Sequence, residues 1–274
     1  MGEFDQSPAA YIAGAPFQRE RQTVFAAHWL VFAASAQMPA AGDYVMHNLG
    51  GWPLFAIRGE DGIARAFHNL CRHQGMPVVE RAAGACAVLR CRYHGWTYDL
   101  AGRFRDAPPR AAPTEPAAQL GLAPAELAEQ DGICLVRVRA GGEPLPRLAL
   151  PPGRLAAATA TDLYANWKAA IEILLARPDW RFLWPLAFVR KDAGGGVLRQ
   201  IVPRSFLRTR FVDLVFAPGG VFGDKAAAAW RERAAADKDA AENCQRAHAA
   251  GTAAPPAPGF AEFLARLAAG AQEG

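Results

Sequence analysis

Two short motifs, CRHQG at residues 71–75 and CRYHGW at residues 91–96, constrain this chain more than any other feature. The first pairs Cys71 with His73, and the second pairs Cys91 with His94. Together they hold two of the five cysteines and two of the six histidines in 274 residues. The first residues, MGEFDQSPAAYIAG, show no signal-peptide pattern, so we expect a cytoplasmic protein with reduced cysteines. Clustered thiols and imidazoles then predict a bound metal.

The spacing of the motifs favours an iron–sulfur cluster. Seventeen residues separate a C-x-H pair from a C-x-x-H pair, in a region that reads as short strands and turns. Two loops of such a domain, each with one thiolate and one imidazole, can close around two irons bridged by sulfide. Gly75 and Gly95 follow the histidines, where tight loops often need a positive φ. The alternatives are a zinc site, which more often uses C-x2-C or H-x3–5-H spacing, and a set of unrelated cysteines and histidines.

CRHQGMP and CRYHGWTYDLAGRF resemble the cluster motifs of the Rieske oxygenase α subunits, the ring-hydroxylating and demethylating enzymes. The resemblance covers roughly residues 10–140. It implies a Rieske [2Fe-2S] cluster with Cys71 and Cys91 on one iron and His73 and His94 on the outer iron. It also implies that the imidazole N–H groups face outward, where a partner accepts the electron. Gln74 stands where these oxygenases usually carry arginine.

Respiratory Rieske proteins differ from this chain around the cluster. They carry an additional pair of cysteines that form a disulfide, and a serine hydroxyl bonded to sulfur. Met76 and Tyr93 occupy the disulfide positions here, and Trp96 occupies the serine position. Fewer hydrogen bonds to the cluster predict a potential near the low end of the Rieske range. Such a potential fits the supply of electrons to a terminal oxygenase.

The pattern along the chain predicts an α+β fold in three parts. FQRERQTVFAAHWLVFAASA repeats apolar residues at helical spacing and predicts an N-terminal helical segment, residues 1–40. Residues 41–143 read as an all-β Rieske domain. Residues 144–274 predict a shortened helix-plus-antiparallel-sheet domain of helix-grip type, in which DLYANWKAAIEILLA is a helix with Asp162 as its N-cap. Given the resemblance, we interpret this last part as a truncated remnant of an oxygenase catalytic domain.

In the oxygenases that the chain resembles, this domain holds a mononuclear iron on two histidines and one carboxylate. The helix that supplies the histidines opens with N-W-K and a glutamate, and Asn166, Trp167, Lys168 and Glu172 match that opening. The family then places a bridging acidic residue and two histidines, where this chain has Arg177, Trp180 and Pro185. Asp237, or less closely Asp239, matches the carboxylate ligand. A lone carboxylate does not hold ferrous iron, so we expect no mononuclear iron.

These observations predict an electron-transfer and assembly subunit of a multi-component Rieske oxygenase, not catalytic on its own. The expected partners are a catalytic Rieske oxygenase subunit in a trimer-based hetero-oligomer, and a reductase or ferredoxin. One alternative is a self-sufficient oxygenase with relocated ligands, Asp237 or Glu172 with His248. Another is a redox-sensing paralogue without catalysis. His248 is otherwise expected to be a surface or packing residue, and Cys244 an ordinary reduced cysteine.

Bulk properties exclude two other classes of partner. The formal net charge is +4, and no block of lysine and arginine stands out, so nucleic acid is not an expected partner. No apolar run approaches the length of a membrane span. The substrate and the reaction type of the complex do not follow from the sequence.

Overall fold

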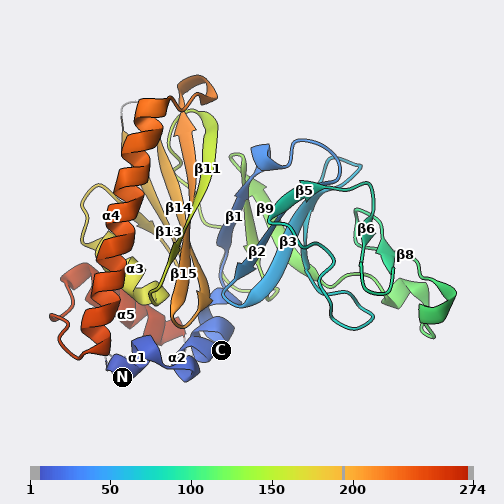
Figure 1. Cartoon of the computed structure of the whole chain (residues 1–274), viewed down its shortest axis with the longest axis horizontal. Helices are drawn as coiled ribbons and strands as arrows, with labels where there is room; N and C mark the ends of the chain where they lie inside the picture. Colours follow the sequence, from blue (N-terminus) through green and yellow to red (C-terminus); the bar gives the residue numbers. More distant parts are fainter. Residues whose placement is uncertain (1–6, 193–194, 271–274) are drawn as a thin grey trace. The chain divides into compact units, whose positions relative to one another are not determined.

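The computed structural model describes residues 7–192 and 195–270 (Figure 1). Two compact units make up the chain. Val31–Gly142 forms one unit, and the described parts of Met1–Leu30 and Glu143–Gly274 form the other. The mixture of a β domain with a helix-and-sheet domain confirms the predicted α+β class.

A seven-stranded sheet dominates the unit of residues 31–142. Its order is β1-β10-β9-β4-β3-β2-β5, and the neighbouring pairs from β10 to β5 are antiparallel. A second sheet of three short antiparallel strands has the order β6-β7-β8. The strands are β1 Leu30–Ala34, β2 Asp43–Leu49, β3 Trp52–Arg58, β4 Ala64–His68, β5 Ala83–Ala85, β6 Leu89–Arg90, β7 Thr97–Tyr98, β8 Phe104–Asp106, β9 Pro124–Gln130 and β10 Ile133–Arg137. Short 3-10 turns are Ser35–Gln37, Pro109–Ala111 and Ala117–Gln119.

The N-terminal segment is helical only in part, so the predicted helix over residues 1–40 is wrong at its C-terminal end. Helix α1 spans Pro8–Ile12, α2 spans Gly14–Glu20, and a π-helical turn spans Arg21–Phe25. Leu30–Ala34 is instead the strand β1, and every residue in it is buried. A continuous apolar run looks the same whether it is a buried helix or a buried strand. Here β1 pairs with β10 at the edge of the large sheet.

The second unit combines α1 and α2 with a five-stranded sheet and three further helices. The strand order is β11-β15-β14-β13-β12, and all neighbouring pairs are antiparallel. Helix α4 runs alongside this sheet, and α3 and α5 lie near one end of it (Figure 1). The strands are β11 Arg154–Leu163, β12 Arg181–Leu183, β13 Ala187–Asp192, β14 Gly195–Ser205 and β15 Arg208–Ala217. The helices are α3 Trp167–Leu175, α4 Asp224–Ala249 and α5 Pro258–Gly270, with a 3-10 turn at Pro218–Gly220.

The start of α3 also differs from the prediction. Asp162 lies within β11, where its carboxylate pairs with Arg210 of β15. The N-cap of α3 is Asn166, whose side-chain oxygen accepts a hydrogen bond from the backbone N–H of Lys168 at 3.0 Å. Asparagine caps helices as well as aspartate does, so the residue type alone did not distinguish the two positions.

No helix in the described part of the chain combines the length and the apolarity that crossing a bilayer requires.

Candidate metal centre

The two cysteine–histidine motifs fold into loops of the same form. Cys71 lies shortly after β4, and its backbone N–H donates to the carbonyl of Met76 at 2.7 Å. Cys91 directly follows β6, and its N–H donates to the carbonyl of Trp96 at 2.9 Å. In each loop the cysteine is therefore bonded to the residue five positions later. Equivalent loops present equivalent donor atoms to the space between them.

One glycine closes each loop. The N–H of Gly75 donates to the carbonyl of Cys71 at 2.8 Å, and the N–H of Gly95 donates to that of Cys91 at 3.0 Å. Gly75 has a φ of 71° and Gly95 a φ of 76°, a region that other residues occupy only with strain. At Gly95 a Cβ atom would also come within 3.0 Å of the Pro108 side chain. The positive φ expected at these glycines is confirmed.

The structure brings the four predicted ligands together. Cys71 and Cys91 are buried, with 3% and 1% of their surface exposed, whereas His73 and His94 are half-buried. The two imidazole rings lie 4.7 Å apart between centroids and are nearly perpendicular, at 89°. Burial, together with the neighbouring Cys91 thiol, raises the pKa of the Cys71 thiol. Two thiols thus lie on the inside of the site and two imidazoles on its outer side.

The donor atoms fit a metal cluster. His73 Nδ1 is buried and has no hydrogen-bond partner, although an orphaned ring nitrogen is costly inside a protein. A bound iron would satisfy it. The ring of His73 stacks on Trp96 at 5.0 Å and 14°, and Trp96 Nε1 donates to the carbonyl of Ala111 at 2.8 Å. This second layer fixes the imidazole orientation, as metal sites require.

Tyr98 adds a hydrogen bond that the sequence comparison with respiratory proteins missed. Its hydroxyl lies 3.1 Å from Cys71 Sγ and accepts the backbone N–H of Arg72, also at 3.1 Å. A metal-bound thiolate carries no proton, so with Cys71 ligating the cluster the Tyr98 hydroxyl is the donor of this hydrogen bond. Trp96 does replace a serine, but the cluster sulfurs keep this one hydroxyl donor. The position of Tyr98, two residues after Trp96, was the available signal.

The N-W-K motif performs a structural task in the other unit. Asn166 caps α3, Trp167 Nε1 donates to Glu20 Oε2 at 2.7 Å, and the Lys168 ammonium binds Glu20 Oε1. Glu20 ends α2, so one buried carboxylate joins the N-terminal helices to α3.

The residues that correspond to the iron site of the oxygenases take part in an arginine–aspartate network. Asp237, on α4, is fully buried. Its carboxylate lies 2.7 Å from Arg199 Nη1 and 2.8 Å from Arg177 Nη2. Arg199, on β14, also binds Asp213 of β15 through two hydrogen bonds of 2.7 and 2.9 Å. The exposed Asp239 takes no part in this network.

Aromatic rings enclose the central guanidinium of that network. The Arg199 guanidinium carbon lies 4.2 Å from the ring centroid of Phe211, 5.0 Å from Trp180 and 5.3 Å from Trp230. Trp180, at the position expected for a histidine ligand, is thus a packing partner of an arginine. Pro185 lies between β12 and β13. Three of the residues matched to the iron site come together around the guanidinium of Arg199. They are Arg177, Trp180 and Asp237.

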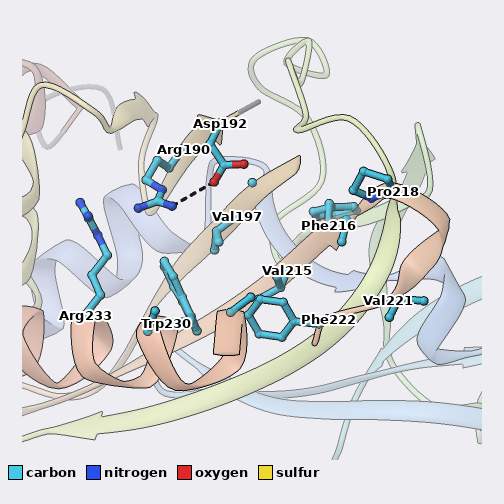
Figure 2. A pocket seen from close by; sticks show the side chains of 14 residues that line it. Arg190, Asp192, Val197, Val215, Phe216, Pro218, Val221, Phe222, Trp230 and Arg233 are labelled. Carbon is cyan, nitrogen blue, oxygen red and sulfur yellow. Dashed lines mark hydrogen bonds and ion pairs between the residues drawn. The ribbon is translucent and has the colours of Figure 1, made fainter. Parts of the chain in front are cut away.

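A cavity of about 510 Å³ lies beside this network, between β14, β15 and the start of α4. Figure 2 shows Arg190 and Arg233 at one end and Phe222 towards the other, with Trp230 on the helix. Among the described residues that line it, the one carboxylate is that of Asp192, which pairs with Arg190 at 3.0 Å. No histidine or cysteine lines it among the described residues, so the cavity offers no set of iron ligands.

A second group of potential ligands lies on α3 and α4. Glu172 Oε2 is 2.8 Å from His248 Nε2 and 3.4 Å from Cys244 Sγ. His248 is buried and its ring stacks on Tyr11 at 3.7 Å and 8°, so it is not the surface residue that was one of the two expectations for it. Burial and the charge of Glu172 raise the pKa of Cys244 to about 12. The C-x-x-x-H spacing of Cys244 and His248 on one helix was the signal that the sequence interpretation did not use.

Comparisons with known proteins agree with the first site. Residues 28–124 match the Rieske [2Fe-2S] domain family. The oxygenase subunit of glycine betaine monooxygenase from Chromohalobacter salexigens is 40% identical over 88 residues, 32% of this chain and 20% of the relative. That from Pseudomonas aeruginosa is 28% identical over 167 residues, 57% of this chain and 39% of the relative. The chain thus matches less than half the length of these relatives.

A solved structure extends the likeness in fold to both units. It is that of a quaternary ammonium Rieske monooxygenase, reported with carnitine oxidation by gut microbiota and inter-subunit electron transfer. The superposition has a TM-score of 0.83 at 19% identity and covers 97% of this chain and 95% of that chain. The chain contains a Rieske [2Fe-2S] domain and is a homologue of the Rieske oxygenase α subunits.

Proposed function

We propose that this chain is an electron-transfer and assembly subunit of a multi-component Rieske oxygenase. Cys71, Cys91, His73 and His94 hold the [2Fe-2S] cluster, which supplies one-electron transfer when it is bound. A reductase or ferredoxin reduces the cluster, and the electron passes to the mononuclear iron of a partner catalytic subunit within a trimer-based assembly. The unit that contains residues 144–274 is the remnant of a catalytic domain and serves as a scaffold.

The geometry of the ligand loops supports the first half of this proposal. The buried thiols and the half-buried imidazoles match a cluster whose histidine-bound iron is nearer the surface. His73 and His94 then present the shortest route for an electron to enter or leave the protein. The orphaned Nδ1 of His73 supports the same ligand assignment.

The observation that carries the second half is the neutralised Asp237. Two guanidinium groups contact its carboxylate, and one of them, that of Arg199, is itself fully buried among aromatic rings. A ferrous ion next to these cations would be repelled strongly in a medium of low dielectric constant. Neither Trp180 nor Arg177 has an atom that ligates iron. Among the side chains matched to the iron site, the guanidinium of Arg199 thus takes the place of a metal cation.

One contact in the structure favours the alternative of a self-sufficient oxygenase. It places Glu172 and His248 in contact, as relocated ligands would require. However, the other potential ligand in that group is the Cys244 thiol, whereas the oxygenase iron site of this type needs two imidazoles and a carboxylate. A redox-sensing paralogue remains the third candidate, and it differs from the proposal in having no catalytic partner.

A complementation experiment tests the proposal. The tagged chain is expressed with the catalytic subunit that co-purifies with it, after the cluster cysteines of that subunit have been replaced by serine. We expect product formation to depend on this chain, because its cluster replaces the missing one. The Cys91→Ser variant of this chain is the matched control and should not complement.

Two outcomes contradict the proposal. One is substrate oxidation by this chain with a reductase and without another oxygenase subunit. The other is a homo-oligomer that binds no catalytic homologue and restores no activity to a cluster-deficient partner.

A further inference from the structure

Glu172, Cys244 and His248 form a compact set of three different ligating side chains. Their donor atoms all lie within 4.8 Å of one another. Two of them share one face of α4, since Cys244 and His248 are at positions i and i+4, about one helical turn apart. The third comes from α3, which packs against α4. Two ligands four residues apart on one helix and a third from a neighbouring element form a common arrangement for zinc.

The positions of the atoms are close to those that a tetrahedral ion needs. Bond lengths of about 2.0–2.3 Å to zinc place ligand atoms about 3.3–3.6 Å apart. Glu172 Oε2 is 3.4 Å from Cys244 Sγ and 2.8 Å from His248 Nε2. Small side-chain rotations therefore convert the present hydrogen bonds into metal bonds. The third separation, from Cys244 Sγ to His248 Nε2, is within 4.8 Å.

The surroundings hold the potential ligands in place. The ring of Tyr11 stacks flat on His248 and directs its Nε2 towards Glu172. Tyr11 is held in turn by the ammonium of Lys168, which lies 5.5 Å from the centroid of its ring and is bound to Glu20. The side chains of His248 and Glu172 are only 10% and 20% exposed, so water competes weakly for their donor atoms.

We propose that Glu172, Cys244 and His248 bind a zinc ion that ties α3 to α4 in the remnant catalytic domain. A thiolate, an imidazole and a carboxylate together select zinc over the hard cations magnesium and calcium. Binding releases the thiol proton of Cys244 to solvent, leaves His248 neutral with Nε2 on the metal, and keeps Glu172 ionised. Three protein ligands leave a fourth position for water. This site lies seven residues along α4 from the arginine-bound Asp237, so it is not the oxygenase iron site.

The test uses the full chain with its cluster assembled, so that the Rieske ligands are not available to added metal. The protein is titrated with Co²⁺ and, separately, with Zn²⁺. We expect one equivalent of Co²⁺ to give the d–d bands of a tetrahedral site and a thiolate-to-cobalt charge-transfer band, both abolished by Zn²⁺. Cys244→Ser should remove the charge-transfer band. Cys244→Ser and His248→Gln should each lower zinc affinity about 100-fold or more.

Cys86→Ser is the matched control, since Cys86 is another partly buried cysteine and lies in the other unit. It should bind both metals as the unaltered chain does. An unchanged visible spectrum of the cluster shows that each variant is folded. If a variant does not fold, the titration of the unaltered chain still decides the question.

Three results would overturn the proposal. The first is the absence of a thiolate-to-cobalt band in the unaltered chain. The second is a band that survives in Cys244→Ser. The third is an additional iron, rather than zinc, in the purified chain that is lost in the same variants. Failure of the complementation experiment, by contrast, leaves the zinc titration unaffected, so the two proposals are tested separately.

Discussion

The hydroxyl of Tyr98 gives a quantitative prediction for the cluster. Burial and the hydrogen bond to Cys71 hold the pKa of Tyr98 above its usual value, so it stays protonated at every working pH. When Cys71 ligates the cluster as a thiolate it has no proton to donate, so the Tyr98 hydroxyl donates to Cys71 Sγ. A donor to a cluster sulfur stabilises the reduced, more negative state more than the oxidised state. Tyr98→Phe should therefore lower the reduction potential.

The size of the shift follows from the strength of the bond. A hydrogen bond to a charged group contributes about 1.5–3 kcal/mol, and we assign about 1 kcal/mol of this to the difference between the two redox states. For a one-electron couple, 1 kcal/mol corresponds to about 40 mV. The ring of Tyr98 is fully buried in the core around the cluster, and phenylalanine preserves that packing.

A redox titration followed by circular dichroism or electron paramagnetic resonance measures the shift. Tyr93→Phe is the matched control, because Tyr93 is 45% exposed. Its potential should stay within about 10 mV of the unaltered protein. The contradicting result is a Tyr98→Phe variant that keeps its iron and whose reduction potential stays as close to that of the unaltered protein as the potential of Tyr93→Phe does. The hydrogen bond from Tyr98 would then have no effect on the reduction potential of the cluster.

Three further substitutions test other parts of the account. Asp237→Asn should destabilise the protein by about 2–3 kcal/mol in urea unfolding, because it removes the carboxylate charge that Arg177 and Arg199 share while Arg199 keeps its pair with Asp213, yet it should leave the iron content unchanged; lost iron would instead make Asp237 a ligand. Gly75→Ala forces a positive φ on alanine and should destabilise by about 1 kcal/mol in thermal unfolding, and an unchanged midpoint would remove the strain argument. The hydrogen bond from Arg58 lowers the pKa of Glu129 below its usual value. The ion pair therefore contributes to the free energy of unfolding, by at most about 1 kcal/mol, at neutral pH. This contribution is lost as the pH falls through the lowered pKa. The difference in unfolding free energy between the unaltered protein and Glu129→Gln should shrink between about pH 5 and pH 3, and a constant difference would contradict the assignment.

The ligand loops were predictable because their chemistry depends on short spacing. A thiol and an imidazole two or three residues apart must lie in one loop, and the glycine after each histidine indicates the turn. Tyr98 was missed because its contact with Cys71 spans 27 residues and follows from strand pairing. The strand at Leu30–Ala34 was missed for a related reason, since only its partner β10 distinguishes it from a helix.

In the second unit, aligning the N-W-K motif with that of the oxygenases predicted some features of the candidate site and missed others. Matching N-W-K correctly located α3 and drew attention to Arg177 and Trp180, and the match of the later helix drew attention to Asp237; the structure brings these three residues together. It gave no sign that Arg199, on a strand far along the chain, stands between them. One alternative from the sequence paired Glu172 with His248 but left out Cys244, which lies within reach of Glu172 although more than seventy residues separate them.

The central claim is that this chain carries a redox-active [2Fe-2S] cluster and no mononuclear iron. Iron analysis of the purified chain, combined with quantitative electron paramagnetic resonance of the reduced cluster, tests it most directly. The account predicts about two irons per chain, with one reduced-cluster signal of Rieske type accounting for both. A reproducible third iron that is required for oxygen-dependent turnover by the chain alone would contradict it.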